Sequence, residues 1–251
     1  MGREPDSRGR GFRMSATQAG SPAADVPRAS RVFGDGPLSR ACALIHTLLT
    51  VEGLLLLTLA PSLLGLLFLG ADPANLPLAA LCLAPLGPAL SAALYALHHR
   101  SRDLTELRPA RAYLRGLRLN SAAALRMWVP LLAWLTVIAY GLTHFASTGL
   151  PGWWAVLLGV IGVGALLWGA HALVLTSLFT FRAVDTARLA GYFLLRHGRA
   201  TLGAASLLVV ATAATLWWTE ALPLLLAPAL LLSLLHTSRP IITETQEDFT
   251  A

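Results

Sequence analysis

Six long apolar segments, separated by short polar stretches, follow a polar N-terminal region. They cover residues 41–69, 77–98, 123–146, 153–181, 203–218 and 221–237. Runs of about 20 apolar residues are typical of helices that cross a lipid bilayer. The last two segments are short, but one helix over both would reach about 50 Å, too long for a single crossing of a core of about 30 Å. The pattern therefore predicts an all-α, polytopic membrane helix bundle with six transmembrane helices.

The composition supports this prediction, because 55% of the 251 residues are hydrophobic and only 13% are charged. Soluble domains carry about 25% charged residues. Residues 1–36 are polar and rich in Arg, Gly, Pro and Ser, a composition that cannot bury a core. We expect a disordered cytoplasmic tail (1–36), a six-helix transmembrane domain (37–240) and a short cytoplasmic C-terminal tail (241–251). The first apolar segment starts too late and is too long for a cleavable signal peptide, and Met14 is an alternative start.

The arginines predict the orientation. All 19 basic residues are arginine: seven precede the first apolar segment, seven lie at 100–126, four at 182–199 and one at 239. The other connections contain none, so the positive-inside rule places both termini and both long loops in the cytoplasm. An aromatic belt is expected at the opposite boundary, formed by Trp153, Trp154, Trp217 and Trp218. Because the arginines follow topology, we expect a lipid bilayer and no nucleic acid as partner.

The first long loop has a pattern of its own. Four arginines recur at three- and four-residue spacing, beside an apolar stripe formed by Leu107, Ala110, Leu114 and Leu117. This pattern predicts an amphipathic helix at the inner leaflet. Its arginines are expected to contact anionic lipid head groups or a partner, and they are Arg108, Arg111, Arg115 and Arg118. The second loop is a weaker version that carries Arg188, Arg196 and Arg199.

Two motifs resemble the YesL-like family of bacterial integral membrane proteins. The first is the Gly-Pro-Ala opening of the second span, and the second is an aromatic, basic stretch that ends in Asn. The matching residues are Gly87, Pro88, Ala89, Tyr113, Arg115, Arg118 and Asn120. The chain departs from the family at Leu114 and Leu117, where phenylalanines are usual, and in the stretch 62–76.

The resemblance, which covers most of residues 33–240, implies a role near carbohydrate uptake. Members of this family are often associated with sugar utilisation, so we expect an accessory or scaffold protein of a carbohydrate transport system. The expected partner is a sugar-transport permease. The preference for Arg over Lys, together with abundant Ala, Leu, Gly and Pro, favours a GC-rich bacterium and hence a multi-pass protein of its cytoplasmic membrane.

Glu52 and His171 are the candidate functional residues inside the spans. Glu52 lies near the predicted midplane, where a carboxylate is costly without a partner. It is either a coupling site for a proton or cation, which would make the protein a small secondary transporter or permease, or a buried group bonded to a polar side chain. Partners at a suitable depth are Thr50, Thr58, Ser91 and His171. We expect His171 to bond a neighbouring helix rather than to relay protons.

Other chemistry is not expected. Cys42 and Cys82 lie within apolar runs without companion ligands, so they predict no metal site. The chain shows no catalytic or nucleotide-binding motif, which favours a protein that is not an enzyme and has no cofactor. Small residues on the span faces are expected to allow close helix packing, and they are Gly87, Ser91, Gly159, Gly162 and Gly169. Pro61 is expected to kink or end the first helix.

Overall fold

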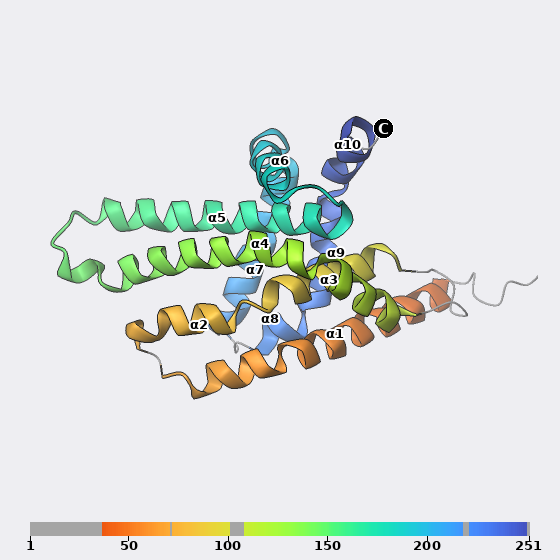
Figure 1. Cartoon of the computed structure of the whole chain (residues 1–251), viewed down its shortest axis with the longest axis horizontal. Coiled ribbons are helices and arrows are strands. Elements are labelled where there is room, and N and C mark those ends of the chain that lie inside the picture. Colours follow the sequence, from red (N-terminus) through yellow and green to blue (C-terminus); the bar gives the residue numbers. More distant parts are fainter. Residues whose placement is uncertain (1–36, 71, 101–107, 218–220, 250–251) are drawn as a thin grey trace, which may run out of the picture. The chain divides into compact units, whose positions relative to one another are not determined.

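The computed structural model describes residues 37–70, 72–100, 108–217 and 221–249, which are helical and contain no strand. The predicted N-terminal tail (1–36) lies outside them. Five stretches of this described part are long and apolar enough to cross a membrane (Figure 1). They are Leu38–Phe68, Pro73–His98, Pro109–Thr143, Trp153–Leu178 and Gly198–Trp217. The predicted all-α membrane bundle is therefore confirmed, with five spans rather than six meeting this criterion.

The sixth predicted segment is divided into two short helices. These are α8 (Ala221–Leu225) and α9 (Ala227–Thr237), of 5 and 11 residues. Proline lies at position 223 in the first and at 228 near the start of the second. A proline lacks the backbone N–H that a continuous helix needs, which is why this apolar run does not form one long helix.

The second predicted span is also broken. It consists of α2 (Leu76–Cys82) and α3 (Leu86–His98), which follow the short 3-10 helix η1 (Pro73–Asn75). The break lies next to Pro85 and Pro88. The indole Nε1 of Trp128 donates a hydrogen bond of 3.0 Å to the carbonyl oxygen of Leu83 at this break. A side chain from another helix thus satisfies a carbonyl group that a broken helix exposes inside the bilayer.

The first and third predicted spans are longer than expected. Helix α1 (Pro37–Phe68) continues through Pro61, so this proline does not end the helix, and the kink that was the other expectation stays a prediction. Helix α4 (Pro109–Thr143) joins the predicted amphipathic loop helix and the third span into one helix of 35 residues. At 1.5 Å per residue it is about 50 Å long, so part of it extends beyond the hydrocarbon core.

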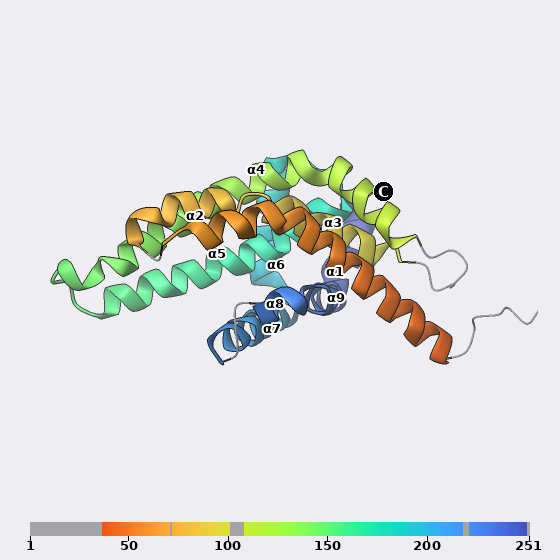
Figure 2. The same ribbon diagram turned by 90° about the horizontal axis from the view of Figure 1, so that it is seen from below.

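The remaining helices complete the bundle. Helix α5 (Trp153–Leu178), which follows the 3-10 helix η3 (Phe145–Ser147), lies beside α4 in Figure 1 and in the rotated view of Figure 2. The second loop forms α6 (Ala183–Arg196), and α7 (Gly198–Trp217) follows it. The expected C-terminal tail is largely helical, since α10 covers Arg239–Phe249 and buries Ile241, Ile242 and Thr245.

Close approach of α3 and α4 determines how the core packs. A Cβ atom on Gly87 would overlap the Trp128 side chain, and one on Gly116 would lie 2.8 Å from Cβ of Tyr95. A Cβ atom on Gly169 of α5 would likewise overlap the side chain of Leu131 of α4. These glycines let the helix backbones approach each other as small residues do in membrane bundles.

The other small residues that we expected at helix contacts differ in their surroundings. Ser91 is fully buried, and the position of a Cβ on Gly162 lies 3.6 Å from Ile138. A Cβ atom placed on Gly159 would have no described atom of another helix within 4 Å. The prediction of close packing is therefore wrong for Gly159, because no described residue of another helix comes close to it.

We predict that Gly87→Ala destabilises the protein, because the added methyl group would displace Trp128 and disturb its hydrogen bond to Leu83. Overpacking of this kind costs about 1–3 kcal/mol. Thermal unfolding of the full chain in detergent measures the effect. Gly159→Ala is the matched control, which should be neutral or slightly stabilising, since alanine favours helix over glycine by about 1 kcal/mol. Equal effects of the two variants would contradict the proposed role of the α3–α4 contact.

Candidate functional site

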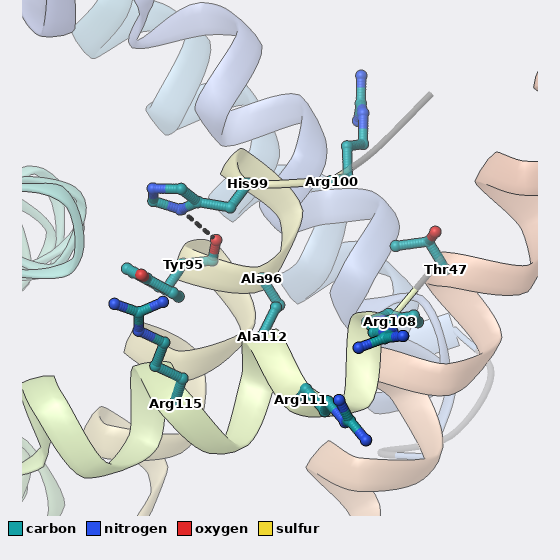
Figure 3. A pocket seen from close by; sticks show the side chains of 10 residues that line it. Thr47, Tyr95, Ala96, His99, Arg100, Arg108, Arg111, Ala112 and Arg115 are labelled. Atoms are coloured by element: carbon teal, nitrogen blue, oxygen red, sulfur yellow. Dashed lines mark hydrogen bonds between the residues drawn. The ribbon is translucent and has the colours of Figure 1, made fainter. Parts of the chain in front are cut away.

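A pocket rich in arginine lies where the end of α3 meets the start of α4 and one side of α1 (Figure 3). Its volume is about 290 Å³. The residues that line it are Thr47, Tyr95, Ala96, His99, Arg100, Arg108, Pro109, Arg111, Ala112 and Arg115. None of these residues is acidic. The pocket is therefore suited to a small anion or to the anionic part of a larger molecule.

The local sequence explains why the arginines lie here. Pro109 occupies the first turn of α4, a position where its missing N–H costs nothing. The buried residues of the next turns are Pro109, Tyr113, Gly116 and Asn120, which recur at three- and four-residue spacing. Because this stripe packs against the protein, Arg108, Arg111 and Arg115 are left exposed. The helix end adds a partial positive charge from its free N–H groups.

This buried stripe differs from the one that we expected. Leu114 is 46% exposed, and Ala110 and Leu117 are only partly buried. Leu107 lies outside the described residues. The helix itself was predicted correctly, but its packed face was not, because tyrosine, glycine and asparagine do not stand out as apolar in a sequence pattern. Arg118 is exposed on the same helix but does not line the pocket.

A second basic pocket of about 540 Å³ lies between α3, α9 and α10. Its basic residues are His98, Arg100, His236 and Arg239. Arg100 borders both pockets, so the two lie next to each other. The sequence did not predict that the end of α3 meets the C-terminal helices α9 and α10.

In the first pocket, the rings of His99 and Tyr95 stack with their centroids 4.2 Å apart, and His99 Nδ1 donates a hydrogen bond to the Tyr95 carbonyl oxygen.

Glu52 is buried near the middle of α1, with 7% of its surface exposed. Neither carboxylate oxygen has a hydrogen-bond partner in the described part of the chain. Glu52 lines neither of the basic pockets. Burial of a polar group without a hydrogen bond costs free energy, so this arrangement needs a reason other than stability.

The four expected partners of Glu52 all bond to other groups. Thr50 donates to the His46 carbonyl oxygen, and Thr58 donates to that of Leu54. The Ser91 hydroxyl lies 3.0 Å from that of Ser177. The fourth, His171, bonds Thr201. The expectation that one of these four residues bonds Glu52 is therefore wrong.

His171 bonds a neighbouring helix, as expected from the sequence. Its Nε2 lies 3.3 Å from Oγ1 of Thr201 on α7. Since Thr201 donates its own hydrogen to the Leu194 carbonyl oxygen, His171 is the donor of this bond. Its Nδ1 is buried without a hydrogen bond among the described residues.

The residues that carried the family resemblance act as helix contacts. Gly87, Pro88 and Ala89 are buried in α3. Tyr113 donates a hydrogen bond of 3.1 Å to Thr58 of α1, and Asn120 donates one of 3.0 Å to the carbonyl oxygen of Ser177 in α5. These bonds tie α4 to helices on either side of it.

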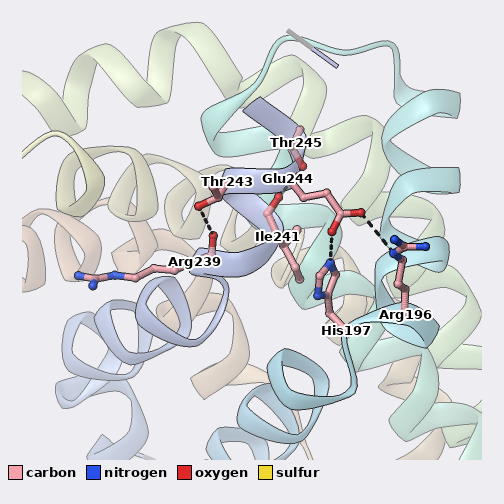
Figure 4. A network of polar contacts seen from close by, with 7 residues as sticks. All are labelled: Arg196, His197, Arg239, Ile241, Thr243, Glu244 and Thr245. Carbon is pink, nitrogen blue, oxygen red and sulfur yellow. Dashed lines mark hydrogen bonds and ion pairs between the residues drawn. The ribbon is translucent and has the colours of Figure 1, made fainter. Parts of the chain in front are cut away.

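A polar cluster that the sequence did not reveal joins α10 to the α6–α7 junction (Figure 4). His197 Nε2 donates to Glu244 Oε2 at 2.6 Å, and Arg196 Nε lies 3.4 Å from Oε1 of the same carboxylate. His197 and Glu244 are about one-fifth exposed, whereas Arg196 is 59% exposed. The histidine bond is therefore the stronger contact, because an exposed ion pair adds little.

The described residues contain no group of three or more His, Cys, Asp or Glu side chains that could hold a metal ion. Cys42 and Cys82 are free cysteines. The sulfur of Cys82 lies 2.9 Å from the position of a Cβ on Gly65, so this thiol fills space between α1 and α2.

We predict that Glu244→Gln loosens α10, because it removes the charge that His197 and Arg196 share. At this partial exposure we expect a loss of about 1 kcal/mol. Hydrogen exchange of residues 239–249 should accelerate several-fold. Glu247→Gln, on the exposed side of the same helix, is the matched control and should leave the exchange unchanged. Unaltered exchange in Glu244→Gln would show that α10 is held by its apolar residues alone.

No protein-family model, curated protein or solved structure matches this chain. The resemblance to the YesL-like family therefore stays a prediction.

Proposed function

We propose that this protein is an accessory or scaffold component of a bacterial cytoplasmic membrane that associates with a carbohydrate transport system. One observation carries the proposal: five arginines of the described chain line two neighbouring pockets at the ends of the helices, and they are Arg100, Arg108, Arg111, Arg115 and Arg239. Within the spans, most buried polar groups bond a neighbouring helix or their own helix, as Tyr113, Asn120 and His171 do. Such a molecule offers a surface for contacts at the membrane boundary rather than an evident path across it.

The proposal includes six crossings with both termini in the cytoplasm. Helices α8 and α9 would form the last crossing, since residues 221–237 reach about 25 Å at 1.5 Å per residue. A slightly short segment is accommodated by local thinning of the bilayer. The arginine-bearing ends of the spans would then face the cytoplasm, and the stacked, exposed Trp153 and Trp154 would lie at the outer boundary.

Reporter fusions test this topology. Thr148 precedes α5 and Asp185 follows it, so the two positions lie at opposite ends of one span. A periplasm-active reporter should work at Thr148 and fail at Asp185, while a cytoplasm-active reporter should show the reverse. Periplasmic activity at Asp185 would contradict the proposed orientation of every span.

The partner in this proposal is a sugar-transport permease, which the sequence resemblance implies. A permease would approach through the lipid-facing side of the spans, while the basic helix ends meet its loops or the surrounding head groups. Helix α7 has room for such a contact, since only Ala200 and Ala204 of its residues are buried. Its exposed side chains include Leu202, Val209 and Val210.

A second function is favoured by Glu52. This carboxyl group at the centre of α1, which has no hydrogen bond to a described residue, is the feature expected of a coupling residue in a small secondary transporter. Helix α1 packs against α3 and α9. Each of these two helices is the second part of a broken segment, since α2 precedes α3 and α8 precedes α9. The breaks lie in the second and last crossings rather than at matching positions of two halves, which weakens the likeness to repeat-built transporters.

Glu52→Gln distinguishes the two functions, because it removes the charge and nearly keeps the shape. The accessory role predicts unchanged pH dependence of sugar uptake, with a permease recovered by gentle co-purification of the tagged wild-type chain. A coupled transporter predicts loss of pH-dependent uptake in the variant. Glu247→Gln, outside the spans, is the control that should alter neither result.

Two outcomes would contradict the accessory role. One is loss of pH-dependent uptake in Glu52→Gln while its abundance stays normal. The other is the absence of a permease from the co-purified material when the same membranes contain one.

A further inference from the structure

The four arginines near the start of α4 are not equivalent in the structure. Arg108, Arg111 and Arg115 line the pocket between α1, α3 and α4, whereas Arg118 does not. At 100° per residue Arg111 and Arg115 leave α4 about 40° apart around its axis, and Arg108 is the N-cap residue that precedes the helix. Figure 3 shows Arg108 and Arg111 on the first turns and Arg115 one turn farther along. These three arginine residues therefore line one cavity.

The surroundings of this pocket favour an anion. The described residues that line it include no carboxylate, and Arg100 and His99 of the α3 end add to its basic character. No side chain caps the start of α4 in the described chain, so the first N–H groups of the helix lack such an acceptor. Guanidinium groups bind phosphate oxygens in a bidentate manner, and a helix N-terminus favours the same charge.

The position of the pocket points to a lipid as the source of that anion. Tyr95 and His99 place it at the end of the apolar stretch Pro73–His98, which is long enough to cross a membrane. Lipid head groups are expected at the end of such a stretch. Apolar side chains next to pocket residues face outward, as Leu114 (46% exposed) and Leu49 (67% exposed) do. A soluble phosphate would make no use of these side chains, whereas the glycerol and upper acyl chains of a phospholipid would contact them.

We propose that the pocket formed by Arg108, Arg111 and Arg115 binds the phosphate of an anionic phospholipid head group. The cavity of about 290 Å³ accommodates a phosphodiester with its glycerol, at the lower end of the range of ligand clefts of roughly 300–1,000 Å³. The bound lipid holds the start of α4 against the ends of α1 and α3. This assignment does not depend on a transport partner.

Native mass spectrometry of the purified full chain in detergent tests the proposal, with phosphatidylglycerol as the probe. Arg111→Ala combined with Arg115→Ala should weaken lipid binding at least about tenfold, the effect of losing one charge-assisted hydrogen bond. Arg118→Ala is the matched control, since it removes one exposed arginine from the same face about 10 Å beyond Arg111. It should change binding less than about twofold, which lies well below the loss of one such bond.

The other probes separate a lipid from a soluble anion. Phosphatidylcholine should bind more weakly than phosphatidylglycerol, because its choline cation opposes the arginines. Inorganic phosphate and glycerol 3-phosphate should not displace the lipid at millimolar concentration. Displacement by either one would overturn the lipid assignment and identify a soluble phosphate compound as the ligand.

Three further results would overturn the proposal. They are equal binding by the wild type and the double variant, equal loss in the Arg118 variant, and equal affinity for the two lipids. Because the three arginines are exposed, the variants should fold, and unchanged helical content by circular dichroism verifies this. The Arg111→Lys and Arg115→Lys variant should keep part of the affinity, since lysine retains the charge but not the bidentate geometry.

Discussion

The close contact between α3 and α4 is the constraint on which the rest of the structure depends. Gly87 and Gly116 leave room for Trp128 and Tyr95, so two aromatic side chains fill the space between the helices. Lipid provides no hydrophobic force to join helices, so this close packing has to stabilise the bundle. The same contact lets Trp128 satisfy the carbonyl group at the break before α3, and it brings the start of α4 to the end of α3. The arginine pocket forms at that meeting point.

Polar side chains in the spans extend this arrangement to the other helices. Tyr113 and Asn120 of α4 bond α1 and α5, and the bond between Ser91 and Ser177 joins α3 to α5. Each of these groups gains a partner that hydrocarbon cannot offer. Glu52 is different, because it is buried and the described residues give it no such bond. A residue of this kind is retained at a cost, and its role separates the two candidate functions.

Much of the fold followed from the sequence, whereas the site did so only in part. Apolar runs of membrane-spanning length predicted the helices, and the recurrence of Arg108, Arg111, Arg115 and Arg118 predicted a basic amphipathic helix. The breaks within the second and last segments were not predicted, because the cost of a proline depends on whether another helix satisfies the freed carbonyl group. The partners expected for Glu52 were wrong because depth along a helix does not fix the direction of a side chain around it.

By itself, the sequence determined that this chain forms apolar helices with arginines at their ends, since hydropathy and charge act locally along the chain. Only the tertiary structure decided which face of α4 is buried, which three of the four arginines near its start border a cavity, and that Glu244 reaches His197 from a distant helix. The reason is physical: these relations arise from contacts between residues far apart in the chain. They depend on the angle and distance at which helices pack, which small residues such as Gly87 control.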